Sequence, residues 1–306
     1  MKIHHELKRD LTRPPLVLAI GFFDGFHRGH QAIVRELRKL RKPGYRTGVV
    51  TFSNHPAAFL RPGTEPALLT TLEERIDLLA RAGIEECFLV PFDERIASLS
   101  PQTFVDDVLV EALGVRAVVV GANFRFGKGR AGDTNLARET LASHDVPFFA
   151  IENTADAGER ISSTRIRALI AAGKTQEAED LLGHAFELRG MVRLGEGRGH
   201  DLGFPTANIE ATGRKVLPKD GVYAGIARHD GRDHAALVSI GTNPTFDGNQ
   251  RTIEAWLRDF TLTIYGEELA VRELRFLRDQ VRYDSVEALL AQMEKDLSAV
   301  AYPSYG

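Results

Sequence analysis

Two histidines in a glycine-rich segment are the residues of this sequence best placed to do chemistry. The segment reads GFFDGFHRGH (residues 21–30) and contains His27 and His30. It follows an apolar run and precedes a stretch with helical spacing, so we expect the pair at a helix N-terminus, where free N–H groups and the helix dipole favour phosphate. Positions i and i+3 share one side of the first turn, and Gly29 leaves room for a phosphate to approach the backbone. Two imidazole donors could there stabilise charge that builds on an α-phosphate during displacement.

A second segment, RISSTRIR (residues 160–167), has the same chemical preference. Hydroxyls and arginines at the start of a predicted helix, here Ser163, Thr164 and Arg165, suit a phosphate. Taken alone, the segment is more simply a helix cap. Two helix starts of this type in one region favour a shared triphosphate.

The C-terminal part contains a different set of candidate residues. A glycine-rich loop that begins at Gly195 allows a ligand to approach the backbone closely. Downstream, Thr206 and Asn208 lie two residues apart, so an extended chain places both on one face. Such hard oxygen ligands suit Mg²⁺ that phosphate oxygens also hold. Glu254 lies in a predicted strand and is a general-base candidate for a hydroxyl, although a solvated strand carboxylate is its simpler interpretation taken alone.

The elements that must position the first set alternate between strands and helices. Short, largely continuous apolar runs separated by helical patterns predict a parallel sheet covered by helices on both faces. Ser100-Pro101 starts one such helix and Gly114 follows its end, and a second helix spans residues 71–82. The expected strands are residues 16–22, 47–52, 86–92, 116–121 and 147–151.

From about residue 185 the pattern changes to strand-like runs separated by Gly, Asn, Pro and Asp. This spacing predicts a small antiparallel barrel or sandwich, closed by an amphipathic helix over residues 285–300. We therefore expect two domains, residues 1–183 and 184–306. The expected strands of the second are residues 186–194, 222–228, 235–240, 251–257 and 269–277.

Composition narrows the function classes. The 306 residues carry 39 Lys and Arg against 42 Asp and Glu, a net charge of −3, which argues against a nucleic-acid-coating surface. The single cysteine, Cys87, excludes an internal disulfide and indicates a reducing compartment, so we expect the cytoplasm. No apolar run approaches the roughly 20 residues of a membrane helix, so we expect no membrane partner. His4, His5 and Glu6 lack a second ligand cluster, and we interpret them as a polar N-terminus.

The first region resembles the HxGH nucleotidyltransferase superfamily and, more narrowly, the adenylyltransferase module of bacterial bifunctional riboflavin kinase/FAD synthetases. The resemblance implies a Rossmann-like α/β domain that transfers AMP from ATP to the phosphate of FMN and releases pyrophosphate. It rests on GFFDGFHRGHQ and RISSTRIR, with TFSNHPAAFL (51–60), LSPQTFVDDVL (99–109) and GANFRFGKGRAGD (121–133) in support.

The resemblance also implies residue roles in this domain. The residues that would contact the ATP phosphates are His27, His30, Ser163 and Thr164. Asn123 and Arg160 would help to hold the reacting groups, and Asp24 would lie beside the nucleotide. The motif positions carried over as nucleotide-binding residues are Gly21, Phe22, Gly29 and Arg165.

The second region resembles riboflavin kinase, a small antiparallel β-barrel with a C-terminal helix. The resemblance implies that Thr206 and Asn208 bind Mg²⁺ and ATP, with Gly195 in the nucleotide loop. Glu254 would deprotonate the ribityl 5′-hydroxyl of riboflavin, and the γ-phosphoryl group would pass directly to that oxygen. The matching segments are LGFPTANI (202–209), DGVYAG (220–225), IGTNPTF (240–246) and IEAWLRDF (253–260).

Several positions depart from the family pattern. In the first region Phe26 and Arg28 stand where smaller or apolar residues are commoner, and Ser53-Asn54 replaces the usual Asp-Pro. In the second, His200 and Trp256 stand where Arg and His are common.

Three other functions remain alternatives. The chain could be a nucleotidyltransferase for another phosphorylated acceptor, with the barrel as a regulatory cap. It could instead be a flavin-binding sensor without catalysis, or an RNA-binding barrel, which the near-neutral charge disfavours. The partners we expect are the small molecules riboflavin, FMN and ATP, with no nucleic acid; an oligomer is possible.

Overall fold

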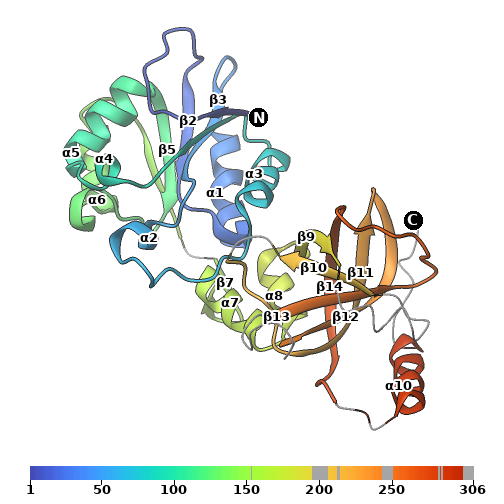
Figure 1. Ribbon diagram of the computed structural model, residues 1–306. Helices are drawn as coiled ribbons and strands as arrows, with labels where there is room; N and C mark the ends of the chain where they lie inside the picture. Colours follow the sequence, from blue (N-terminus) through green and yellow to red (C-terminus); the bar gives the residue numbers. More distant parts are fainter. Residues whose placement is uncertain are drawn as a thin grey trace. The chain divides into compact units, whose positions relative to one another are not determined.

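The computed structural model describes residues 1–152, 154–194, 206–211, 214–242, 251–281, 283 and 285–298 (Figure 1). The chain divides into two compact units, residues 1–66 with 72–163 and residues 67–71 with 164–306. Within the described ranges, no helix is both long and apolar enough to cross a membrane. The expected domain division at residues 183 and 184 stays a prediction.

A parallel sheet forms the first unit, as predicted. Within the described part of this unit its six strands lie in the order β1-β4-β3-β2-β5-β6, and every neighbouring pair is parallel. β2 is buried at all five positions because both faces of the sheet are covered. The strands are β1 (Lys2–His4), β2 (Leu16–Ile20), β3 (Arg46–Phe52), β4 (Glu86–Val90), β5 (Val115–Gly121) and β6 (Phe148–Ile151), and a small hairpin follows from β7 (Ala155–Asp156) and β8 (Glu159–Arg160).

Successive side chains of each strand point to opposite faces of the sheet, so the core of this unit has two layers. Leu16, Leu18 and Ile20 of β2 pack with residues of α6 (Thr134–Ala142) and the π-helix η2 (Phe104–Ala112) on one face. Val17 and Ala19 pack with residues of α1 (Arg28–Lys39) and α3 (Leu72–Arg81) on the other. The remaining helical segments of the unit are η1 (Asp24–Phe26), α2 (Pro56–Leu60), α4 (Glu94–Ala97), α5 (Pro101–Thr103) and η3 (Lys128–Arg130).

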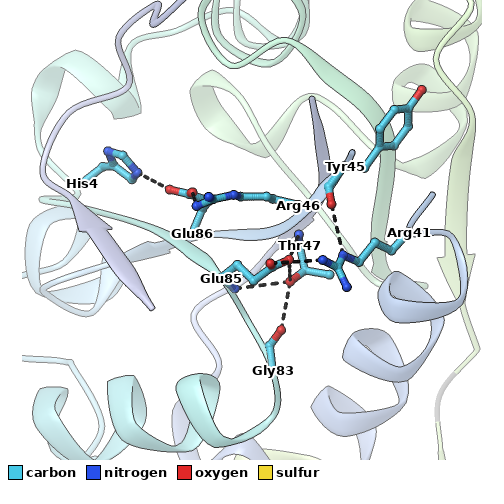
Figure 2. Close-up of polar contacts among 8 residues, drawn as sticks. All are labelled: His4, Arg41, Tyr45, Arg46, Thr47, Gly83, Glu85 and Glu86. Carbon is cyan, nitrogen blue, oxygen red and sulfur yellow. Dashed lines mark hydrogen bonds and ion pairs between the residues drawn. The ribbon is translucent and has the colours of Figure 1, made fainter. Parts of the chain in front are cut away.

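The interpretation of His4, His5 and Glu6 as a polar N-terminus did not include a strand that the structure shows. Residues 2–4 form β1 at one edge of the sheet, paired in parallel with β4, and His4 has a buried side-chain partner on that strand. His4 Nε2 lies 2.6 Å from Glu86 Oε2, and Arg46 Nη1 donates to the other carboxylate oxygen at 2.6 Å (Figure 2). The His4 ring also stacks on Phe88, 4.8 Å between centroids. This network lies at the amino ends of β3 and β4, whereas residues 21–30 follow the carboxyl end of β2, so we assign it to stability.

Glu86→Gln should therefore destabilise the first unit by about 1–3 kcal/mol at neutral pH, because two charge-assisted hydrogen bonds to a buried group are lost. Burial acts to raise the pKa of Glu86, but the hydrogen bonds from His4 and Arg46 outweigh it and lower the pKa. A lowered carboxyl pKa gives stability that is complete above the unfolded-state pKa and is lost as the pH falls through the folded-state pKa. The difference between the two proteins in urea unfolding should be present at pH 7 and shrink towards pH 3. An equal difference at both values would contradict the assignment.

The second unit is built on the antiparallel barrel that the sequence predicts. In the described ranges, six strands close in the order β10-β13-β12-β11-β14-β9. The strands are β9 (Glu187–Arg193), β10 (Thr206–Ala211), β11 (Gly221–His229), β12 (Arg232–Thr242), β13 (Arg251–Leu257) and β14 (Glu268–Arg278). Helices α7 (Ser163–Ala171) and α8 (Thr175–Leu182) precede the barrel, and α10 (Val286–Ser298) follows it.

Alternation also decides which barrel residues face outward. Along β13, Ile253, Ala255 and Leu257 are buried, whereas Glu254 and Trp256 are partly exposed. Trp256 joins an outer apolar cluster with Ala235 and Leu237, and Leu297 of α10 packs against the same cluster. The terminal helix therefore covers the barrel face that also carries Glu254.

Candidate active sites

The first site lies where the connections of the parallel sheet change direction. From β2 the chain proceeds to β3 on one side and, later, to β5 on the other side. Ligands of such sheets bind beyond the carboxyl ends of the strands at this switch point. Gly21 and Phe22 directly follow β2, and Asn123 follows β5, the neighbouring strand. The fold thus places Gly21, Phe22 and Asn123 beyond the carboxyl ends of two neighbouring strands, β2 and β5.

The loop that carries the two histidines has an unusual backbone. Phe23, Gly25 and Phe26 all have positive φ values, of 58°, 73° and 35°. Such a conformation is costly for a phenylalanine, and the surrounding structure must hold it. Both rings are buried, at 1% and 4% exposure, which supplies that stabilisation. Aromatic burial thus helps to fix the turn that ends at His27.

The two histidines lie together at the start of α1. Their rings stack with 3.7 Å between centroids and 16° between planes. His27 is the N-cap residue, and its Nδ1 accepts the backbone N–H of His30 at 3.4 Å. A neutral His27 therefore carries its proton on Nε2. The predicted arrangement, with two imidazoles on one side of the first turn, is the one the structure shows.

The environment of His30 keeps its imidazole neutral. Burial lowers its pKa well below the usual value, and the proximity of His27 and Arg75 lowers the pKa further. His30 Nδ1 is buried and has no hydrogen-bond partner within the described residues. A buried unpaired ring nitrogen is costly, and a ligand that pairs with it recovers that cost.

The second predicted segment meets the first through Ser163. Its Oγ donates to the backbone carbonyl of Asp24 at 3.0 Å, and Asp24 is itself 4% exposed. Thr164 and Arg165 follow in the first turn of α7, and Arg160 lies exposed in β8. Ser163 thus lies against the loop before α1.

Gly29 is closely confined by His27. A Cβ added at Gly29 would lie 3.0 Å from Cε1 and 3.1 Å from Nδ1 of the His27 ring, so the imidazole would have to move by a few tenths of an ångström. Gly29→Ala should leave the fold intact, since alanine is the better helix former by about 1 kcal/mol, but it should slow adenylyl transfer by about tenfold or more through the displaced ring. Melting temperature and adenylyl-transfer rate, measured side by side, test this. Unchanged transfer would show that the ring position is not critical.

A second site forms on the outer face of the barrel, across three neighbouring strands. Asn208 of β10 pairs in register with Glu254 of β13, which pairs in register with Ser239 of β12. Thr206 pairs with Trp256 in the same way. Directly opposed residues of antiparallel strands share a face, with Cβ atoms about 5 Å apart. The register thus places Thr206, Asn208 and Glu254 on one surface.

Sequence reasoning missed Ser239, which lies beside Glu254 on that surface. Its Oγ accepts a hydrogen bond from Gln280 Nε2 at 2.9 Å. The period-2 pattern of β12 could have placed it outward, but the strand register that sets it next to Glu254 is not readable from one sequence. Gly195 and His200 lie outside the described residues.

Comparison with known proteins identifies both halves. Residues 10–165 match the FAD synthetase family and residues 182–302 match the riboflavin kinase family. The chain is 38% identical over 299 residues to a bifunctional riboflavin kinase/FMN adenylyltransferase of Listeria monocytogenes, covering 96% of this chain and 94% of that protein. The chain belongs to this bifunctional family. It is also 36% identical over 285 residues to the Escherichia coli K12 member, covering 92% of this chain and 90% of that protein.

A solved structure supports the same architecture. The chain superposes with a TM-score of 0.89 on a crystal structure described as a macrolide-efflux protein from Streptococcus pneumoniae. The two are 32% identical, and the match covers 99% of this chain and 100% of the other. The riboflavin kinase/FMN adenylyltransferase family carries out two ATP-dependent steps, phosphorylation of riboflavin to FMN and adenylylation of FMN to FAD with release of pyrophosphate.

Proposed function

We propose that the two sites divide the two reactions, with adenylyl transfer at the start of α1 and phosphoryl transfer on the outer face of the barrel. The proposal rests on two chemically different groups of side chains, one within each unit. One is a stacked imidazole pair at a helix N-terminus in the first unit. The other is a carboxylate flanked in register by an amide and a hydroxyl in the second unit.

In the first site, His27 and His30 would donate to the ATP phosphates and stabilise the charge that develops as the α-phosphate is attacked. The Nε2 donor of His27 and the unpaired ring nitrogen of His30 support this role. Ser163 and Thr164 would hold the remaining phosphates, and Asn123 and Arg160 the reacting groups. The other residues proposed to line the nucleotide are Gly21, Phe22, Asp24, Gly29 and Arg165.

In the second site, Glu254 would take the proton of the ribityl 5′-hydroxyl as the γ-phosphoryl group is transferred. Thr206 and Asn208 would supply neutral oxygen ligands to Mg²⁺, with phosphate oxygens completing the set. Neutral oxygen donors of this kind fit a cation that is held jointly with the phosphates of ATP. When bound, the ion would neutralise charge on the transferred phosphate. Gly195 would lie in the nucleotide loop.

Product analysis tests the division. Incubation with riboflavin, ATP and Mg²⁺, followed by chromatography, should give FMN and then FAD, and added pyrophosphate should oppose only the second step. A nucleotidyltransferase for another acceptor would leave riboflavin unchanged, and a flavin sensor would bind it without consuming ATP. The cytoplasmic location and the oligomeric state stay predictions.

A further inference from the structure

Arg75 is a buried charge that neither proposed site uses. It lies on the face of α3 that also carries Leu72, Ile76 and Leu79, where a core side chain is expected from the spacing. Its exposure is only 3%. Burying a guanidinium has a large desolvation cost unless hydrogen bonds and nearby charges offset it. The contacts of Arg75 should therefore show why an arginine stands at this position.

Those contacts join two strand ends at the first site. Arg75 Nη1 donates to the carbonyl of Phe22 at 2.8 Å, and Nη2 donates to the carbonyl of Phe52 at 2.6 Å. The guanidinium also lies over the Phe22 ring, 4.2 Å from its centroid. Phe22 is the second residue after β2, and Phe52 is the last residue of β3, the adjacent strand. One planar group therefore fixes both carbonyls and the first ring of the loop that leads to His27.

The charge remains in place at neutral pH. Burial lowers the pKa of Arg75 to about 10, while the nearby Asp24 carboxylate acts to raise it. Nε is buried without a hydrogen-bond partner in the described residues. The desolvation cost of the guanidinium is therefore offset by the two carbonyls, the Phe22 ring and the Asp24 carboxylate. Asp24 belongs to the same loop as Phe22. The two terminal nitrogens of the guanidinium thus bind the backbone beside the loop that carries the imidazole pair.

We propose that Arg75 is a positioning residue for adenylyl transfer, which holds the Phe22 carbonyl and thereby the strained loop from which His27 and His30 project. The loop contains two phenylalanines with positive φ directly before His27, so its conformation depends on such external anchors. The inference rests on the assignment of adenylyl transfer to this loop. Lysine could keep the charge but not the planar fork that reaches both carbonyls.

The test compares Arg75→Met and Arg75→Lys with Arg81→Met, a matched loss of charge at an exposed position of the same helix. We expect kcat for FAD formation from FMN to fall about 30- to 100-fold in Arg75→Met and less in Arg75→Lys, with the KM for ATP changed by less than about threefold. Riboflavin phosphorylation by the same preparations should be unchanged, as should Arg81→Met in both reactions. A purely structural role predicts instead a lower melting temperature with normal kcat in the folded enzyme, and that result would overturn the proposal.

Chemical rescue gives a second measurement in case Arg75→Met folds poorly. In Arg75→Ala, ethylguanidinium should restore FAD formation severalfold, whereas ethylammonium should not, because only the planar cation bridges the two carbonyls. Equal effects of both cations, or none, would contradict the inference. If both Arg75→Met and His27→Asn leave FAD formation intact, the assignment of adenylyl transfer to this loop is wrong. If His27→Asn abolishes FAD formation and Arg75→Met does not, only the role of Arg75 is wrong.

Discussion

His27→Asn should lower the rate of FAD formation from FMN by about 10²- to 10³-fold, because it removes a donor aimed at charge that develops in the transition state. Asparagine is chosen because it is among the best N-cap residues, and can replace His27 Nδ1 as acceptor of the His30 N–H. The start of α1 should therefore stay folded while the imidazole is lost. Steady-state kinetics with supplied FMN and ATP measure the effect.

Riboflavin phosphorylation provides the control within the same chain. It should be unchanged in His27→Asn, since that reaction is assigned to the second unit, and the melting temperature should stay close to that of the wild type. If both reactions slow equally in a folded variant, the assignment of separate sites to separate reactions is wrong.

Glu254→Gln should produce the reverse pattern, with phosphorylation of riboflavin slowed by about 10²- to 10⁴-fold and FAD formation from supplied FMN retained. Glutamine keeps the size and the neighbours of Glu254 between Asn208 and Ser239, so the change removes the proton acceptor alone. With riboflavin as the sole flavin, neither FMN nor FAD should accumulate. Chromatography of the flavins at fixed times measures both outcomes.

Glu210→Gln is the matched control for this change. Glu210 is an exposed carboxylate two positions beyond Asn208 on β10, paired with Arg193 rather than with the proposed site. Its loss should leave phosphorylation unaffected. Comparable losses in Glu210→Gln and Glu254→Gln would indicate a general charge effect on the barrel surface instead of proton transfer.

The fold was largely predictable because its signals are local. Short apolar runs marked β2 to β6, and the strand-helix alternation implied a parallel sheet. β1 was missed because three residues with one apolar side chain carry no periodic signal, and the strand depends on Glu86, far away in sequence. The helix expected after Ser100-Pro101 ended before Gly114 as predicted, but most of it is a π-helix, for which the sequence carries no recognised pattern.

The candidate sites were predictable only where the motif is contiguous. His27 and His30 lie three residues apart, so helix geometry alone brings them together. Arg75 and Ser239 reach the sites through tertiary contacts, although an arginine on the apolar face of α3 was a visible anomaly. Asn54, which departs from the family pattern, bonds both backbone groups of Phe92, with Nδ2 donating at 3.0 Å and Oδ1 accepting at 2.7 Å. These two hydrogen bonds join the segments that follow β3 and β4. They could not be predicted from the presence of an asparagine at position 54.

Closure of the barrel stabilises the strand register on which the second site depends. Glu254, Asn208 and Ser239 meet because three strands hold one alignment, and a shift of β13 by a single residue would turn Glu254 into the hydrophobic interior. In an open sheet an edge strand can slide independently. In a closed ring each strand is locked by two neighbours, so such a slip would have to pass around the whole circumference. A one-residue deletion inside β13 should therefore disrupt the alignment of Glu254 with both Asn208 and Ser239.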